Sequence, residues 1–90
     1  MRISEKKKEK IFEQILSALF SVSPKPLFTS HIANEIARDE EFTKKLLAEL
    51  KSKKLIKAIT KNSKGADYLR RIRWVLSDIA YTAYKTHQTN

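Results

Sequence analysis

The sequence predicts a mainly helical α+β domain with the element order helix, short strand, helix, helix, β-hairpin, helix. Apolar residues recur at three- and four-residue spacing in the helical segments, which gathers them on one face of each helix. Between residues 55 and 76 the pattern becomes β-branched and alternating instead. A turn at 62–67, which holds the only glycine of the chain, divides that stretch into two strands.

Length and composition indicate one small globular domain. The chain has 90 residues, of which 41% are hydrophobic and 32% are charged, so we expect a single domain over 1–90 with frayed ends at 1–5 and 87–90. The absence of cysteine excludes a disulfide framework and a cysteine-based zinc site. No apolar run resembles a signal peptide or a membrane span, so we expect a cytoplasmic protein. The Lys/Glu-rich composition with one glycine is also typical of thermophile proteins.

The first helix is predicted over residues 4–21. Lys6, Lys7 and Lys8 lie in its first turns, where we expect a solvated, fraying end. The Pro-Lys-Pro segment at 24–26 stops the helix, because proline cannot continue it, and residues 27–29 are predicted to be extended. The apolar stripe of this helix consists of Ile11, Phe12, Ile15, Leu16, Leu19 and Phe20.

Two further helices follow at short intervals. Thr29 or Ser30 is expected to cap the second helix, which runs to about residue 38 and buries Ile32, Ile36 and Ala37. Asp39 is expected to cap the third helix, over 40–53, with two glutamates in its favourable first turn. The third helix buries Phe42, Leu46, Leu47 and Leu50, and its outward positions are Lys44, Lys45, Ala48, Glu49, Lys51 and Ser52.

The strands of the hairpin are predicted at 55–61 and 68–76. In the second strand Trp74 and Leu76 point to the same side, because successive side chains alternate, and Trp74 is a predicted core anchor together with Phe42. Ser77 is expected to cap a last helix, whose inward residues are Ile79, Ala80, Ala83 and Tyr84.

The charge of the chain is concentrated rather than scattered. Residues 51–73 hold nine Lys or Arg side chains against one acid, which accounts for +8 of the formal net charge of +9. Concentrated positive charge is typical of proteins with an anionic partner, although a solvated, solubilising surface is the simpler alternative.

The element order and two segments resemble the winged-helix-turn-helix regulators of archaea and bacteria. The first segment is 27–38 leading into 42–56, and the second is Arg70-Arg71-Ile72-Arg73-Trp74-Val75-Leu76-Ser77-Asp78, where an aromatic-x-Leu-Ser pattern ends the wing. The resemblance covers about residues 8–86. It implies a winged helix-turn-helix fold and a protein that binds double-stranded DNA as a transcriptional regulator or chromatin-like factor, associated with the nucleoid in a prokaryote.

The resemblance also implies positions for the DNA contacts. In this family the third helix enters the major groove, the start of the second helix holds a phosphate, and the hairpin forms a wing along the minor groove. The third helix, at 40–53, then places Thr43, Lys44, Lys45 and Ala48 near base edges and Lys51 near phosphate. The phosphate contacts at the second helix are Thr29 and Ser30, and those of the wing are Lys61, Asn62, Lys64, Arg70, Arg71 and Arg73.

The sequence departs from the family pattern at two places. Lys54 stands where many members have glycine after the third helix, which costs about 1 kcal/mol if this residue is left-handed. Asp39, Glu40 and Glu41 would approach the groove first; they either stabilise the helix start or accept a hydrogen bond from cytosine N4. This acidic start favours the alternative of a winged-helix protein–protein adaptor, and RNA binding is a third possibility.

No catalytic or cofactor site can be assembled from the sequence. His31 and His87 are distant in the chain and have no cysteine and no clear carboxylate partner, so we expect no metal site and no enzyme activity. We expect no cofactor and no small-molecule substrate. A homodimer through the first and last helices is a further expectation, with Tyr81 as the residue that packing within one chain explains least.

Overall fold

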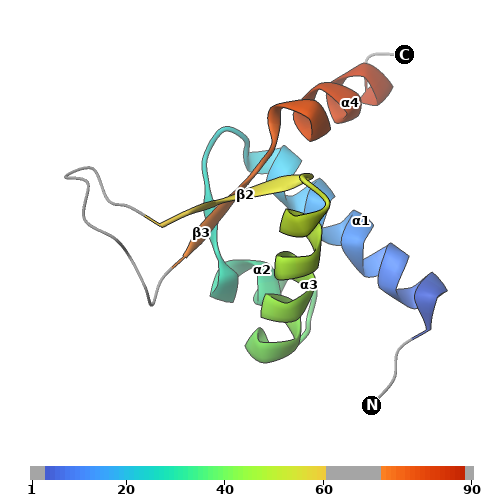
Figure 1. The fold of residues 1–90 in the computed structure, drawn as a ribbon, viewed down its shortest axis with the longest axis vertical. Helices are drawn as coiled ribbons and strands as arrows, with labels where there is room; N and C mark the ends of the chain where they lie inside the picture. Colours follow the sequence, from blue (N-terminus) through green and yellow to red (C-terminus); the bar gives the residue numbers. More distant parts are fainter. Residues whose placement is uncertain (1–3, 61–71, 89–90) are drawn as a thin grey trace.

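The computed structural model describes residues 4–60 and 72–88 of the chain. Its elements follow the predicted order (Figure 1). Helices packed with a three-stranded antiparallel sheet make it a mainly helical α+β fold, as the sequence predicts. None of the helices in this part of the chain is long and apolar enough to cross a membrane. The elements are α1 (Glu5–Val22), β1 (Leu27–Phe28), α2 (Thr29–Glu35), α3 (Glu40–Ser52), β2 (Ile56–Ile59), β3 (Arg73–Leu76) and α4 (Asp78–Gln88).

The sheet has the strand order β1-β3-β2, with β3 in the centre. Trp74 of β3 lies opposite Leu27 of β1 on one side and opposite Ala58 of β2 on the other. The β2–β3 pair is antiparallel and ends at Ile59 opposite Arg73, which makes it the base of the predicted hairpin. Residues 61–71 lie outside the described part, so the predicted strands at 55–61 and 68–76 are seen only at 56–59 and 73–76.

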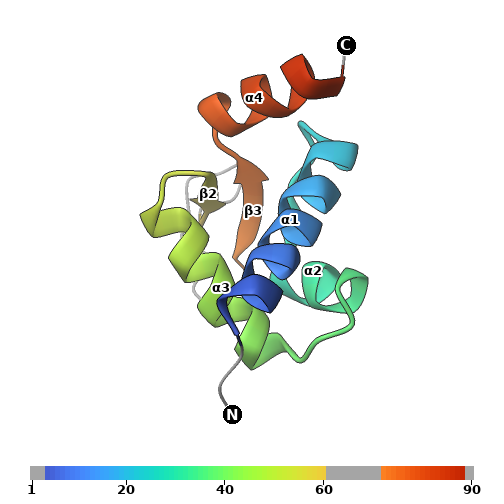
Figure 2. The ribbon, with the colours of Figure 1, turned by 90° about the vertical axis from the view of Figure 1, so that its right-hand side faces the viewer.

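The core lies between one face of the sheet and helices α1, α2 and α3. Trp74 and Leu76 both point into it, because alternate residues of a strand share a face. Figure 2 shows α1 running beside β3, and α2 and α3 pack against each other. The buried apolar side chains are Ile11, Phe12, Ile15, Leu19, Ile32, Ala33, Ile36, Leu46, Leu47, Leu50, Ile56, Trp74, Leu76 and Ala80.

A hydrogen bond inside this core joins the sheet to α2. The indole Nε1–H of Trp74 donates to Thr29 Oγ1 at 2.9 Å. Only 4% of Trp74 is exposed, which confirms it as a core anchor. The second predicted anchor, Phe42, is only half-buried; it packs against the core while the guanidinium of Arg38 lies 5.6 Å from its ring centre.

Two of the predicted helix caps are confirmed. The backbone N–H of Phe42 donates to Asp39 Oδ1 at 2.7 Å at the start of α3. The backbone N–H of Ala80 donates to Ser77 Oγ at 3.2 Å at the start of α4. Both side chains satisfy a backbone donor that has no partner within the helix.

The prediction for the start and end of α2 is wrong. The residue before α2 is Phe28, which has no side-chain oxygen, and Thr29 and Ser30 are the first helical residues rather than caps. The helix ends at Glu35, because Ala37 has a left-handed backbone with φ of 56° and cannot continue it. Ala37 is consequently exposed instead of buried.

The predicted inward face of α4 is correct for only half of its residues. Ala80 is buried and Tyr84 is half-buried, but Ala83 is exposed and 76% of Ile79 is exposed. Figures 1 and 2 show why: α4 projects from the body, so only a narrow side of it meets other elements. Ile79 precedes Ala80 by one position and is therefore turned about 100° away from that side.

The last turn of α1 supports α4 through aromatic contacts. The ring of Phe20 lies 5.5 Å from the ring of Tyr81 and 5.5 Å from the ring of Tyr84, measured between centroids. Burial, followed by the carboxylate of Glu13, raises the pKa of the Tyr84 phenol. The contact with Phe20 within one chain therefore accounts for part of the position of Tyr81, although 37% of this residue remains exposed.

Lys54, at the turn from α3 into β2, has a left-handed backbone with φ of 63°. In that conformation a Cβ atom crowds the backbone, so glycine is favoured there. Lys54 stands where the family pattern has glycine, and its left-handed backbone is the conformation for which that glycine is suited.

Replacing Lys54 by glycine should raise the free energy of unfolding by about 0.5–1 kcal/mol, because glycine adopts positive φ without the Cβ penalty. Urea unfolding followed by circular dichroism measures the change. The same substitution at Lys53, where φ is −82°, is the control and should give no gain. A Lys54→Gly protein no more stable than wild type would show that the turn carries no such strain.

The bond between Trp74 and Thr29 gives a second prediction. Thr29→Val keeps the shape but leaves the buried indole N–H without an acceptor, so it should lower the free energy of unfolding by about 1–3 kcal/mol. Thr29→Ser retains the acceptor and should stay within about 1 kcal/mol of wild type. Thermal and urea unfolding of the two variants test this, and equal stabilities would argue against the bond.

Candidate nucleic-acid interface

The side chains that α3 presents to solvent are fixed by those it buries. Leu46, Leu47 and Leu50 are at most 4% exposed, so this side of the helix is sealed against α1, α2 and the sheet. The opposite side of an α-helix must then face outward, because successive residues are turned by about 100°. The predicted outward residues Lys44, Lys45, Ala48, Lys51 and Ser52 are all exposed.

Thr43 does not belong to this exposed face, which corrects the prediction that it lies near base edges. Its exposed fraction is 0%, and its hydroxyl donates to the backbone carbonyl of Asp39 at 2.8 Å. A threonine that satisfies its hydroxyl within its own helix can pack its methyl group in a core. Thr43 is therefore part of the buried side of α3, together with its leucines.

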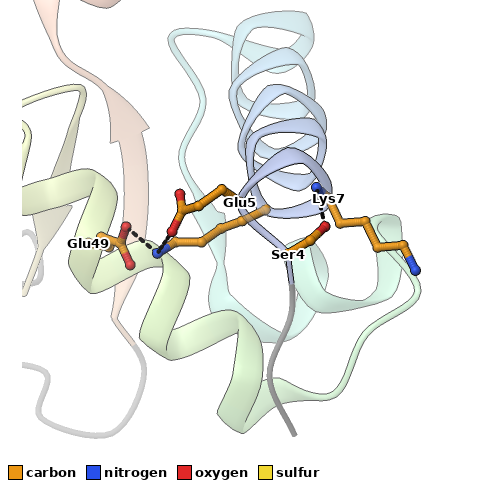
Figure 3. Close-up of polar contacts among 5 residues, drawn as sticks. Ser4, Glu5, Lys7 and Glu49 are labelled. Atoms are coloured by element: carbon orange, nitrogen blue, oxygen red, sulfur yellow. Dashed lines mark hydrogen bonds and ion pairs between the residues drawn. The ribbon is translucent and has the colours of Figure 1, made fainter.

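Glu49 was predicted to point outward, but it is half-buried and faces α1. Its Oε2 lies 2.8 Å from Nζ of Lys8, and Glu5 lies 3.9 Å from the same ammonium group (Figure 3). The hydrogen bond to Glu49 is the main cause that raises the pKa of Lys8 above its ordinary value of 10.5. The interpretation of Lys6 to Lys8 as a solvated end is therefore wrong for Lys8, which joins α1 to α3. Ser4 caps this end of α1 by accepting from the backbone N–H of Lys7 at 3.2 Å.

On the side of α3 that faces α1, the aromatic ring of Phe12 lies close to two ammonium groups. Nζ of Lys8 is 5.9 Å and Nζ of Lys53 is 5.3 Å from the ring centre of Phe12. Both distances lie within the range of a cation–π interaction. This side of α3 is thus occupied by contacts with α1, which leaves the lysines on its other sides as the exposed ones.

The acidic start of α3 is partly explained by helix capping. One oxygen of the Asp39 carboxylate accepts the Phe42 N–H, so the cap alternative is confirmed for this residue. Glu40 and Glu41 are exposed in the first turn, where the helix dipole favours negative charge. Arg38, directly before Asp39, is an exposed cation that the sequence interpretation left out, and its guanidinium lies 5.6 Å from the ring centre of Phe42.

At the start of α2 the two predicted phosphate contacts differ. Thr29 is half-buried and its oxygen already accepts the indole N–H, while Ser30 is exposed. His31, in the same turn, is exposed and its ring lies 5.5 Å from that of Phe28. Ser30 is therefore the more accessible of the two hydroxyl groups.

The hairpin contributes cations at its base. Arg73 is half-buried at the first position of β3, and Lys57 of β2 is exposed with Nζ 4.0 Å from Oδ1 of Asp78. The sequence interpretation counted Lys57 in the basic stretch but not among the contacts. The remaining predicted wing residues lie outside the described residues: Lys61, Asn62, Lys64, Arg70 and Arg71.

Solved structures share this fold at low sequence identity. The S. aureus MepR–DNA complex has a TM-score of 0.68 and 22% identity, covering 93% of this chain and 73% of MepR. MepR in a DNA-binding conformation has a TM-score of 0.67 and 20% identity, over 97% of this chain and 57% of that one. Lactococcus lactis ZitR, a zinc-responsive MarR family member, has a TM-score of 0.63 and 20% identity, over 99% and 54%.

The chain thus spans about half the length of ZitR. No family model matches the sequence, and no curated protein matches it. The structural similarity establishes the fold, which is the winged helix seen in these MarR-type regulators.

Proposed function

We propose that this chain is a DNA-binding transcriptional regulator that places α3 in the major groove of double-stranded DNA. The observation that carries the proposal is the exposed lysine face of α3, held outward by the complete burial of the opposite side. The major groove admits an α-helix and displays base edges to it. The shared fold with S. aureus MepR, which has been solved as a DNA complex, supports the proposal.

The contacts follow from the position of each residue on α3. Lys44, Lys45 and Ala48 face the base edges in this arrangement, and Lys51 reaches a backbone phosphate. In the described residues, no ion pair involves any of these three lysines, so their charges are available to an anionic partner. Glu40 and Glu41 stabilise the start of the helix and weaken DNA affinity to a lesser degree than the lysines raise it.

The second helix and the hairpin supply phosphate contacts on either side of α3. Ser30 offers its hydroxyl and its backbone N–H to a phosphate, with Thr29 in a supporting position beside Trp74. The wing contacts that we propose are Lys61, Asn62, Lys64, Arg70, Arg71 and Arg73. A regulator of this kind acts in the cytoplasm without catalysing a reaction.

Duplex binding should depend steeply on salt, because each phosphate neutralised by Lys or Arg releases condensed counterions. With about five or six such contacts, the logarithm of the association constant should fall against the logarithm of salt with a slope of roughly −5. Fluorescence anisotropy on a random-sequence duplex at several salt concentrations measures this slope. Lys51→Ala should reduce its magnitude by about 1.

Lys10→Ala is the matched control for that variant. Lys10 is also an exposed lysine, but it lies on α1, on the surface beside Glu13 and Ile36 rather than on α3. The control should leave the slope unchanged. If Lys51→Ala and Lys10→Ala weaken saturable duplex binding to the same extent, the binding is nonspecific electrostatic attraction and the proposal is contradicted. No saturable binding at low salt would favour the protein–protein adaptor instead.

We also propose that the chain forms a homodimer through α1 and α4, with Tyr81 in the seam. Tyr81 is 37% exposed beside Phe20 at the end of α1, which gives an aromatic surface continuous over both helices. Buried aromatic side chains contribute strongly to such interfaces. A twofold dimer would read two half-sites about one helical turn of DNA apart.

Sedimentation velocity over a range of protein concentrations tests the dimer. Tyr81→Ser should shift the protein to monomer, because it removes the aromatic contact area from both copies at once. Thr82→Ser, at the neighbouring exposed position of α4, should leave the association unchanged. A wild-type protein that remains monomeric at the concentrations needed for duplex binding would contradict this interface.

A further inference from the structure

An open groove of about 620 Å³ lies where the end of α3, the start of β2 and the start of α4 meet. Three lysines line it: Lys51, Lys54 and Lys57. All three are exposed, and they come from three consecutive parts of the chain: the last turn of α3, the following turn and β2. Against these three cations the lining holds one carboxylate, Asp78, so the groove carries a net positive charge.

Part of the lining of the same groove is apolar. Ile56, Ala58 and Ile79 line it together with the lysines. Ile79 is the more exposed of the two large apolar side chains on the described surface, at 76%. Leaving an isoleucine in water is unfavourable in proportion to its exposed apolar area, so covering it would stabilise a complex. The groove thus combines positive charge with an uncovered apolar side chain.

DNA fits this combination poorly. The groove lies along β2 from Ile56 to Ala58, beside the end of α3 and the start of α4, whereas the segment that connects the hairpin begins after Ile59. A phosphate group has no apolar surface that would cover Ile79. The Asp78 carboxylate, which also lines the groove, lies 4.0 Å from Nζ of Lys57 and offsets part of its charge toward any anion, so it does not distinguish phosphate from a carboxylate. Of the lysines that line the groove, only Lys51 is among the DNA contacts proposed above.

A second copy of the chain also fits poorly. With a formal net charge of +9, two copies repel each other wherever their cationic surfaces meet. Tyr81, in the proposed dimer seam, is two positions from Ile79 and so lies about 200° away around α4. The groove and the seam are therefore on different sides of this helix.

We propose that this groove is a docking site for an acidic segment of a partner protein, with an apolar side chain of that segment covering Ile79. The acidic groups of the segment pair with Lys54 and Lys57, and its apolar residue packs against Ile79 and Ala58. Charge complementarity selects the acidic segment and steers its approach, while the apolar contact distinguishes it from other polyanions. The site shares only Lys51 with the exposed face of α3, and it goes beyond DNA binding.

The test uses a fluorescein-labelled peptide in which glutamates alternate with leucines, titrated with the full chain and followed by anisotropy. The comparison peptide has serine in place of every leucine. Ile79→Ser should weaken binding of the leucine peptide roughly tenfold, the effect of uncovering one aliphatic side chain. Ile79→Leu should restore it. Ile79→Ser should leave binding to the random-sequence duplex unchanged.

Lys57→Ala should weaken binding of the leucine peptide, and Lys10→Ala, on α1, should not. The proposal is overturned if the leucine peptide does not bind, or if the serine peptide binds equally well, because the groove then recognises charge alone. It is also overturned if Ile79→Ser weakens duplex binding, which would make DNA the occupant. Dissociation of a wild-type dimer by Ile79→Ser in sedimentation would assign the groove to a second copy.

Discussion

The complete burial of one side of α3 is the constraint on which the rest of the structure depends. Thr43, Leu47 and Leu50 are fully removed from solvent. Helix α3 cannot rotate about its axis without exposing these side chains, and exposing even one buried leucine costs about 1.5–3 kcal/mol. The same packing that stabilises the domain therefore determines which lysines point outward. Stability and the geometry of the candidate interface have one origin.

The charges of α3 divide according to this arrangement. Two of its acidic groups have structural partners: the Asp39 carboxylate accepts a backbone N–H, and the Glu49 carboxylate is paired with Lys8 of α1. The lysines on the exposed sides have no such partners among the described ion pairs. Glu40 and Glu41 stay exposed in the first turn, so the cationic part of the helix surface is its middle and end, where Lys44, Lys45 and Lys51 lie. Composition alone would not reveal this.

The fold and the outward lysines of α3 were predictable because they follow from local periodicity, whereas the contact of Glu49 with Lys8 of α1 was not. The caps Asp39 and Ser77 were also predicted correctly from the local sequence, whereas the cap predicted at Thr29 or Ser30 was wrong because α2 begins at Thr29 itself. The burial of Thr43 follows the same periodicity, because it lies three, four and seven positions before Leu46, Leu47 and Leu50; it was missed because its hydroxyl suggested a polar position, whereas that hydroxyl is satisfied by the Asp39 carbonyl four residues back. The exposure of Ile79 was not predictable, since it depends on how far α4 projects from the body. The left-handed turn at Lys54 was found only through the family pattern, because nothing in lysine itself indicates positive φ.

The chain has a single tryptophan, and the structure places it at the junction of the sheet and α2. The indole of Trp74 is almost completely shielded from water and its N–H is hydrogen-bonded to Thr29. Its emission is therefore a spectroscopic signal from one known location, with no second indole to confuse it. Any ligand that shifts α2 against β3 would change this signal, and a ligand that binds elsewhere without moving them would not. The intrinsic fluorescence of Trp74 therefore reports on the contact between the helix-turn-helix and the sheet.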